Sequence, residues 1–122
     1  MHRTKQLTAA AALAASLALA APAVAGQTAS TPLAGSVGPG FTISLMKGGK
    51  AAKTLKPGSY TITVKDKSSA HNFHIFGPGV KKVVTSVPFV GTKSVTVTLK
   101  KGTYTFVCDP HASNMKGTFK VA

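Results

Sequence analysis

The sequence of 122 residues contains a single cysteine, Cys108, and neither tryptophan nor glutamate. One cysteine cannot form a disulfide within the chain, so internal disulfides cannot hold this protein together. The only acidic residues are Asp66 and Asp109, which argues against hydrolysis by a pair of carboxylates. The Gly-x-Ser-x-Gly motif of many serine hydrolases is also absent. These absences favour a binding or carrier protein over an enzyme.

The first 25 residues have the composition of a secretory signal peptide. Arg3 and Lys5 give a basic start, residues 7–21 are rich in alanine and leucine, and residues 23–25 offer a small-residue cleavage site. We therefore predict export to the periplasm or the extracellular space, with no stable membrane insertion after cleavage. The alternative is that the apolar segment stays uncleaved as a membrane anchor.

Positive charge far exceeds negative charge in this chain. Fifteen lysine and arginine residues against two acidic residues give a net charge of +13. Without Arg3 and Lys5, thirteen lysines and a net charge of +11 remain. Such a field speeds association with acidic partners or anionic surfaces. Nucleic acid is not the expected partner, because export is predicted and no arginine remains to recognise phosphates and bases.

The pattern after the signal peptide is that of a β protein. Residues 26–40 are rich in serine, threonine, proline and glycine, which predicts a flexible linker or N-terminal approach. Residues 41–122 alternate apolar and polar side chains in short runs that end at glycine or proline, without a helical period. Threonine and valine, which favour strands, dominate these runs. This pattern predicts an all-β domain over residues 41–122, a β-sandwich.

Two segments of the chain resemble each other. Residues 55–64 have the sequence Leu-Lys-Pro-Gly-Ser-Tyr-Thr-Ile-Thr-Val, and residues 99–108 have Leu-Lys-Lys-Gly-Thr-Tyr-Thr-Phe-Val-Cys. Each predicts a turn that leads into a strand, so we interpret the likeness as the same local structure formed twice. Because side chains alternate along a strand, Cys108 is predicted to face the core together with Tyr104 and Phe106.

Three side chains that bind copper lie close together near the end of the chain: Cys108, His111 and Met115. Pro110 forces a bend after the predicted strand, which lets His111 fold back toward the cysteine. A short loop cannot enclose a metal ion alone, and His71, at the start of a core strand, is the candidate for the remaining ligand. Two imidazoles, a thiolate and a weak thioether form the set that selects copper for one-electron transfer.

Several neighbours of these residues have candidate roles. Asn72 is predicted to hydrogen-bond across to the cysteine loop and hold it, or else to be a simple turn residue. His74 points away from His71 in an extended strand, which predicts a surface position unless a bulge redirects it. Asp109 is a candidate for capping the turn after Cys108. Four lysines recur every third residue and predict a solvated hairpin or a docking patch: Lys47, Lys50, Lys53 and Lys56.

At these residues the chain resembles the plastocyanin/azurin family of small type 1 (blue) copper proteins, the cupredoxins. The likeness covers residues 41–122 and rests on His71-Asn72, the strand of residues 102–108 and the spacing from Cys108 to His111. It implies a Greek-key β-sandwich or barrel of about seven or eight strands. It also implies one copper ion with His71, Cys108 and His111 as equatorial ligands and Met115 as the axial ligand. Three residues separate His111 from Met115, a spacing that differs from the two or four typical of related loops.

The resemblance and the ligand set together predict an exported monomeric electron carrier whose copper cycles between Cu(II) and Cu(I). Its expected partner is an acidic redox protein that binds transiently, beside small apolar groups at Pro110, Ala112 and Phe89. One alternative is a copper-binding or copper-delivery protein without electron shuttling. Another is an interaction module of the same shape that holds no metal.

Overall fold

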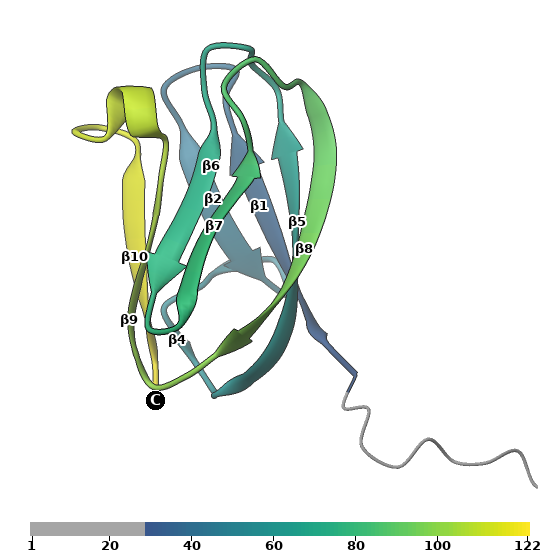
Figure 1. Ribbon diagram of the computed structural model, residues 1–122, viewed down its shortest axis with the longest axis vertical. Coiled ribbons are helices and arrows are strands. Elements are labelled where there is room, and N and C mark those ends of the chain that lie inside the picture. Colours follow the sequence, from purple (N-terminus) through teal and green to yellow (C-terminus); the bar gives the residue numbers. More distant parts are fainter. Residues whose placement is uncertain (1–28) are drawn as a thin grey trace, which may run out of the picture.

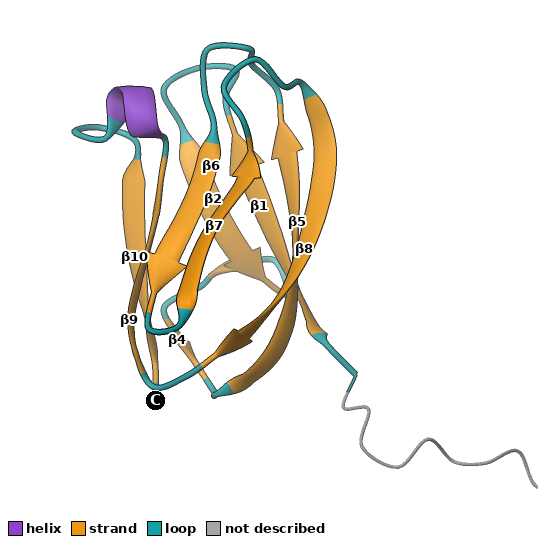
Figure 2. Ribbon diagram, viewed as in Figure 1, coloured by secondary structure: helices purple, strands orange, loops and turns teal. Residues whose placement is uncertain are grey.

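The computed structural model describes residues 29–122, which form two five-stranded β-sheets packed face to face (Figures 1 and 2). The first sheet has the order β3-β2-β1-β5-β8, and the second has the order β4-β10-β9-β6-β7. This arrangement confirms the predicted β-sandwich. Residues 1–25, the predicted signal peptide, lie outside the described residues.

All the regular elements but one are strands. The first sheet contains β1 (Thr31–Val37), β2 (Ile43–Lys47), β3 (Lys50–Ala51), β5 (Gly58–Asp66) and β8 (Gly91–Leu99). The second sheet contains β4 (Thr54–Leu55), β6 (Phe73–Gly77), β7 (Val80–Thr85), β9 (Gly102–Val107) and β10 (Lys116–Val121). A short 3-10 helix, η1 (Asp109–His111), follows β9.

Strand β1 corrects the prediction of a flexible segment over residues 26–40. It lies between β2 and β5, and it pairs in parallel with β5 from Thr31 opposite Tyr60 to Val37 opposite Asp66. Leu33 and Val37 are buried in the core. The described domain therefore includes residues 31–37 and begins well before residue 41.

The register places the ends of several strands at one end of the sandwich, the upper end in Figure 1. Strand β5 finishes there at Asp66, and β6 starts there at Phe73. His74 of β6 lies opposite Val107, the last residue of β9, and Val107 lies opposite Lys116, the first residue of β10. The loops after β5 and β9 therefore meet at the upper end.

The core contains aromatic rings, four of the five from the second sheet, and aliphatic side chains from both sheets. Tyr104 stacks on Phe119 with ring centroids 5.3 Å apart, and Phe73 stacks on Phe106 with centroids 5.9 Å apart. Fully burying side chains of this size contributes about 1.5–3 kcal/mol each. This packing anchors β6 and β9, the two strands that lead to and from the upper loops.

The two similar segments do form the same structure. The hydroxyl of Tyr60 donates a hydrogen bond to the carbonyl of Lys56, four residues earlier, at 2.6 Å. The Tyr104 hydroxyl lies 3.1 Å from the carbonyl of Lys100, also four residues earlier, and accepts a hydrogen bond from the Lys100 amide at 2.9 Å. Each tyrosine thus fastens the turn before its own strand. In β9 this fixes the alternation that turns Cys108 inward, where it is fully buried.

Candidate metal centre

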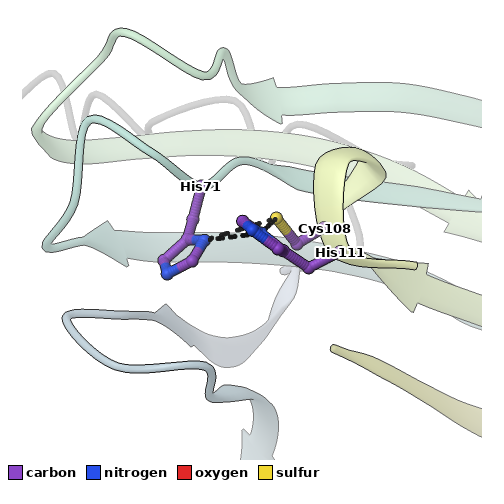
Figure 3. A group of neighbouring side chains, drawn as sticks. All are labelled: His71, Cys108 and His111. Carbon is purple, nitrogen blue, oxygen red and sulfur yellow. Dashed lines mark hydrogen bonds between the residues drawn. The ribbon is translucent and has the colours of Figure 1, made fainter. Parts of the chain in front are cut away.

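Three potential metal ligands converge at the upper end of the sandwich (Figure 3). The Nδ1 atoms of His71 and His111 lie 3.1 Å apart. The Sγ atom of Cys108 lies 3.7 Å from Nδ1 of His71 and 3.6 Å from Nδ1 of His111. His71 comes from the loop between β5 and β6, whereas the other two come from the loop after β9. The predicted convergence of two distant segments is confirmed.

The triangle formed by these atoms fits a metal ion. A point equidistant from the three atoms lies about 2.0 Å from each, close to the usual bond length between a first-row divalent metal and imidazole nitrogen. Two nitrogens and a sulfur with lone pairs directed at one point repel one another unless a proton or a cation lies between them. Sulfur and imidazole ligands together favour copper, zinc or iron over magnesium or calcium.

Local turns fix the position of His71. Buried Asp66, at the end of β5, accepts a hydrogen bond from the Ser68 amide at 3.1 Å. The Ser68 hydroxyl accepts one from the Ala70 amide, also at 3.1 Å. Gly38 has φ +74°, and a Cβ atom there would lie 3.3 Å from the ring of His71. A glycine at this position therefore lets the neighbouring loop approach the imidazole closely.

The loop after β9 closes on itself by backbone hydrogen bonds. The His111 amide donates to the Cys108 carbonyl at 3.0 Å, and the Met115 amide donates to the His111 carbonyl at 2.8 Å. The Cys108 amide donates to the Met115 carbonyl at 3.0 Å. Pro110, which has no amide hydrogen, lies inside the short helix η1 without losing a bond. The loop thus brings His111 back to Cys108 and fully buries the Met115 side chain.

The side chain of Asn72 joins the two loops that carry the potential ligands. Its Nδ2 donates to Oδ2 of Asp109 at 2.8 Å, and its Oδ1 accepts from the Asp109 amide at 2.7 Å. Asn72 is almost fully buried. The predicted contact between Asn72 and the cysteine loop is therefore present, and it includes the Asp109 side chain as well as the backbone.

His74 also takes part in this network, which corrects its predicted surface position. Burial still alternates along β6 through His74, so the side chain lies on the face opposite Phe73 and Ile75, where its Nδ1 is 3.0 Å from Oδ1 of Asp109. Its side chain is only 16% exposed. Burial raises the pKa of Asp109, but the hydrogen bonds from Asn72 and His74 and the charge of protonated His74 outweigh it, so the pKa lies below its ordinary value.

Comparison with known families supports a copper site at this place. The sequence profile of copper-binding proteins of the plastocyanin/azurin family matches residues 40–122. The chain belongs to the plastocyanin/azurin family. The cluster at the upper end fits the single type 1 copper ion of that family. Comparison with curated proteins gives no match.

Solved structures show the same fold. Reduced rusticyanin is 24% identical, with a TM-score of 0.53, and the match covers 78% of this chain and 82% of that one. Auracyanin A, a blue copper protein from Chloroflexus aurantiacus, is 19% identical with a TM-score of 0.53, over 77% of this chain and all of the other. A chain of a heme-copper terminal oxidase dimer is 21% identical with a TM-score of 0.50, over 75% of this chain and 63% of that one. At sequence identities this low, the similarity to these structures shows a shared fold alone.

Phe41 is a residue of this plastocyanin/azurin domain that sequence reasoning assigned only to a strand. Its ring makes edge contacts with His71 and His111, at centroid distances of 5.6 Å and 4.9 Å, yet the residue is 62% exposed. The available signal was a phenylalanine after Gly38-Pro39-Gly40, a segment that cannot form a regular strand. Phe89, predicted to contribute to the docking surface, lies under Nζ of Lys93, 4.3 Å from the ring centroid, near the upper end of β8.

Across residues 29–122, the structure contains no helix that is long and apolar enough to span a membrane.

Proposed function

We propose that this protein carries single electrons by means of one copper ion held by His71, Cys108 and His111, with Met115 as a weaker fourth ligand. The observation that carries this proposal is the convergence of one cysteine sulfur and two imidazole nitrogens at a point that a metal ion fits. When bound, copper supplies a one-electron couple between Cu(II) and Cu(I).

The surrounding residues support electron transfer by keeping the ligand set rigid and dry. Cys108 and Met115 are fully buried and His71 is 3% exposed, so water is largely excluded from one side of the site. The two hydrogen bonds between Asn72 and Asp109 hold both ligand loops in place. A ligand cage that moves little between two oxidation states lowers the structural cost of gaining or losing an electron.

His111 is the proposed point of entry and exit for the electron. It is the only one of the three converging side chains that is partly exposed. Phe41, Pro110 and Ala112 are exposed around it or beside it in the chain and supply a small apolar surface. Weak redox encounters use small interfaces of this kind. Phe41 is therefore added to the docking surface that we propose.

An acidic redox partner that binds transiently fits the charge of this end of the domain. Lys65, Lys67, Lys93 and Lys116 are exposed near the upper strand ends. Exposed charges act over a Debye length of about 8 Å at physiological salt. The rate of electron transfer to an acidic partner should therefore fall as salt rises. A rate that stays flat from low to high salt would contradict electrostatic steering.

We further propose that the domain works as a monomer after export to the periplasm or the extracellular space. The basic start, the apolar segment over residues 7–21 and the small residues at positions 23–25 support this location. The lone cysteine is consistent with it, because binding to a metal would protect the thiol from oxidation.

Copper titration of the purified protein tests the function. We expect Cu(II) to produce an intense visible band from the thiolate, which a mild reductant removes and an oxidant restores. Cys108→Ser should abolish the band. His74→Gln provides the control, because this neighbouring imidazole lies outside the converging group and its loss should leave the band in place.

Two other outcomes would replace the proposal. Colourless binding of Cu(I), without a reversible visible band, would favour the copper-delivery alternative. Failure to bind either form of copper would leave an interaction module with the same fold.

A further inference from the structure

The lysines of this domain are distributed in a way that electron transfer at His111 does not explain. All thirteen lysines of the described residues are exposed. Lys47 and Lys56 line one surface hollow, of about 210 Å³, and Lys81, Lys82 and Lys100 line a second, of about 410 Å³. Neither hollow is lined by an acidic residue or by any residue of the metal centre.

These hollows lie toward the lower end of the sandwich. The first includes Thr31 and Gly58, the opening residues of β1 and β5. The other ends of these strands, Val37 and Asp66, lie beside the loop that carries His71. A strand of nine residues such as β5 spans roughly 30 Å. The first hollow is therefore almost the full height of the domain away from the metal centre.

The second hollow involves the turns that close β6 and β8. It includes Gly79, in the turn between β6 and β7, and Lys100, in the turn between β8 and β9. Both turns are tied together by Tyr104, whose hydroxyl lies 2.8 Å from the carbonyl of Pro78. Lys101 follows in the same turn and is exposed. The lower turns of both sheets therefore present lysines.

The acidic side chains lie at the other end of the domain. Asp66 and Asp109 are the only acidic side chains, and both lie at the upper end, one closing β5 and the other following Cys108. With a Debye length of about 8 Å at physiological salt, the two ends act on their surroundings independently. The lower end is thus strongly positive, whereas the upper end has mixed charge.

We propose that the lower end, with Lys47, Lys56, Lys100 and Lys101 at its centre, is a docking surface for an anionic lipid membrane. Docking there turns the metal centre toward the solvent, where redox partners can reach His111. A partner protein held at the lower end would instead lie roughly 30 Å from the copper ligands, which suits the lower lysines poorly for steering electron transfer.

The entry point of the chain favours a membrane over a soluble polyanion. Ala29 lines the first hollow, so the chain enters the domain at the lower end (Figure 1). Seven residues, 22–28, lie between Ala29 and the end of the apolar segment over residues 7–21, so a fully extended chain separates the two by at most about 28 Å. A membrane that holds this segment, in the precursor or as an uncleaved anchor, therefore lies within about 28 Å of the lower end. The lysines also occupy turns of both sheets and line two separate hollows, so they are spread over the lower end.

Binding to lipid vesicles tests this proposal. The protein is mixed with vesicles of phosphatidylcholine alone or of phosphatidylcholine with phosphatidylglycerol, and the bound fraction is measured by sedimentation. A lysine close to an anionic surface raises binding about fivefold. The lower-end variant carries Lys47→Gln, Lys56→Gln, Lys100→Gln and Lys101→Gln. The matched control carries Lys65→Gln, Lys67→Gln, Lys93→Gln and Lys116→Gln.

Both variants lose four charges and keep the same N-terminal segment, so any insertion by that segment cancels in the comparison. We expect the lower-end variant to lose binding to anionic vesicles by roughly 100-fold or more, and the control by less than about fivefold. Circular dichroism and the visible copper band should be unchanged in both. The copper band reports on the proposed function separately, so the two proposals can fail independently.

Three results would overturn the membrane assignment. Equal losses in the two variants would show that net charge alone governs binding. Absence of preference for anionic vesicles would remove the lipid surface as the partner. Tighter binding to soluble polyglutamate than to anionic vesicles would assign the lower end to an acidic polymer.

Discussion

Replacing Asn72 with alanine tests how the two ligand loops are held before any metal binds. The substitution removes the hydrogen bond from Nδ2 to the Asp109 carboxylate and the one that Oδ1 accepts from the Asp109 amide. A neutral hydrogen bond contributes about 1 kcal/mol, and one to a charged group about 1.5–3 kcal/mol. The second value must be reduced, because the Asp109 side chain is 51% exposed and solvent screens its charge. We therefore expect Asn72→Ala to lower the free energy of unfolding by about 2 kcal/mol.

Urea unfolding of the metal-free protein measures this loss, with circular dichroism as the signal. In a domain of fewer than about 100 residues, such a loss lowers the melting temperature by roughly 10 °C. Asn114→Ala is the matched control, because Asn114 is an exposed asparagine of the other ligand loop, the one after β9, and surface substitutions of this kind change stability by about 0.5 kcal/mol or less.

A double-mutant cycle separates the two contacts of Asn72. Asp109→Ala removes the carboxylate but keeps the amide that Asn72 accepts from. The coupling between the two substitutions should therefore be about 1 kcal/mol, close to the discounted strength of the single charged hydrogen bond. If Asn72→Ala costs no more than Asn114→Ala, the loops are held by other contacts and this reasoning is wrong.

The remaining predictions concern the metal centre and its surface. Met115→Leu should keep the visible copper band and raise the reduction potential, because loss of the thioether favours Cu(I); an unchanged potential in voltammetry would remove Met115 from the ligands. Phe41→Ala should lower the potential by tens of millivolts, because water that reaches His111 stabilises the more highly charged Cu(II) state; an equal potential would show that the ring does not shield the site. Since the pKa of Asp109 is lowered in the folded protein, its charge stabilises the fold above pH 4 or so, and this contribution is lost as the pH falls through the lowered pKa. Above about pH 4 the free energy of unfolding of the metal-free protein in urea should thus exceed that of Asp109→Asn, and the difference should shrink below this pH. A difference that does not depend on pH would contradict stabilisation of the Asp109 charge by Asn72 and His74.

Strands with strict alternation were predictable from the sequence. Strand β5 alternates its buried residues from Tyr60 to Val64, and β9 does so from Tyr104 to Phe106. Strand β7 was missed, because Lys81, Lys82 and Val83 form an exposed run between its buried residues. The pairing of β7 with β6 skips Val84, which breaks the alternation within β7, and an edge strand tolerates exposed lysines.

Strand β1 was predicted to be a linker because its local composition is not typical of a strand. Its composition, with Pro32 and Gly35 among small residues, resembles a flexible segment. Its pairing with β2 on one side and β5 on the other supplies hydrogen bonds that local composition does not reveal. Tertiary packing also favours glycine at position 35, since a Cβ atom there would crowd the side chains of Val64 and Phe73.

The amino-acid pattern alone determined the fold class and the chemical nature of the metal centre. Alternation identifies half-buried strands. A lone cysteine near histidine and methionine favours copper because thiolate and thioether sulfur and imidazole nitrogen are the ligands that copper prefers. Only the tertiary structure decided how His71 meets Cys108 and His111, that Asp109 ties Asn72 and His74 to the cysteine loop, and that Phe41 covers both imidazoles. These contacts join residues 30 or more positions apart in the sequence, so no local pattern encodes them.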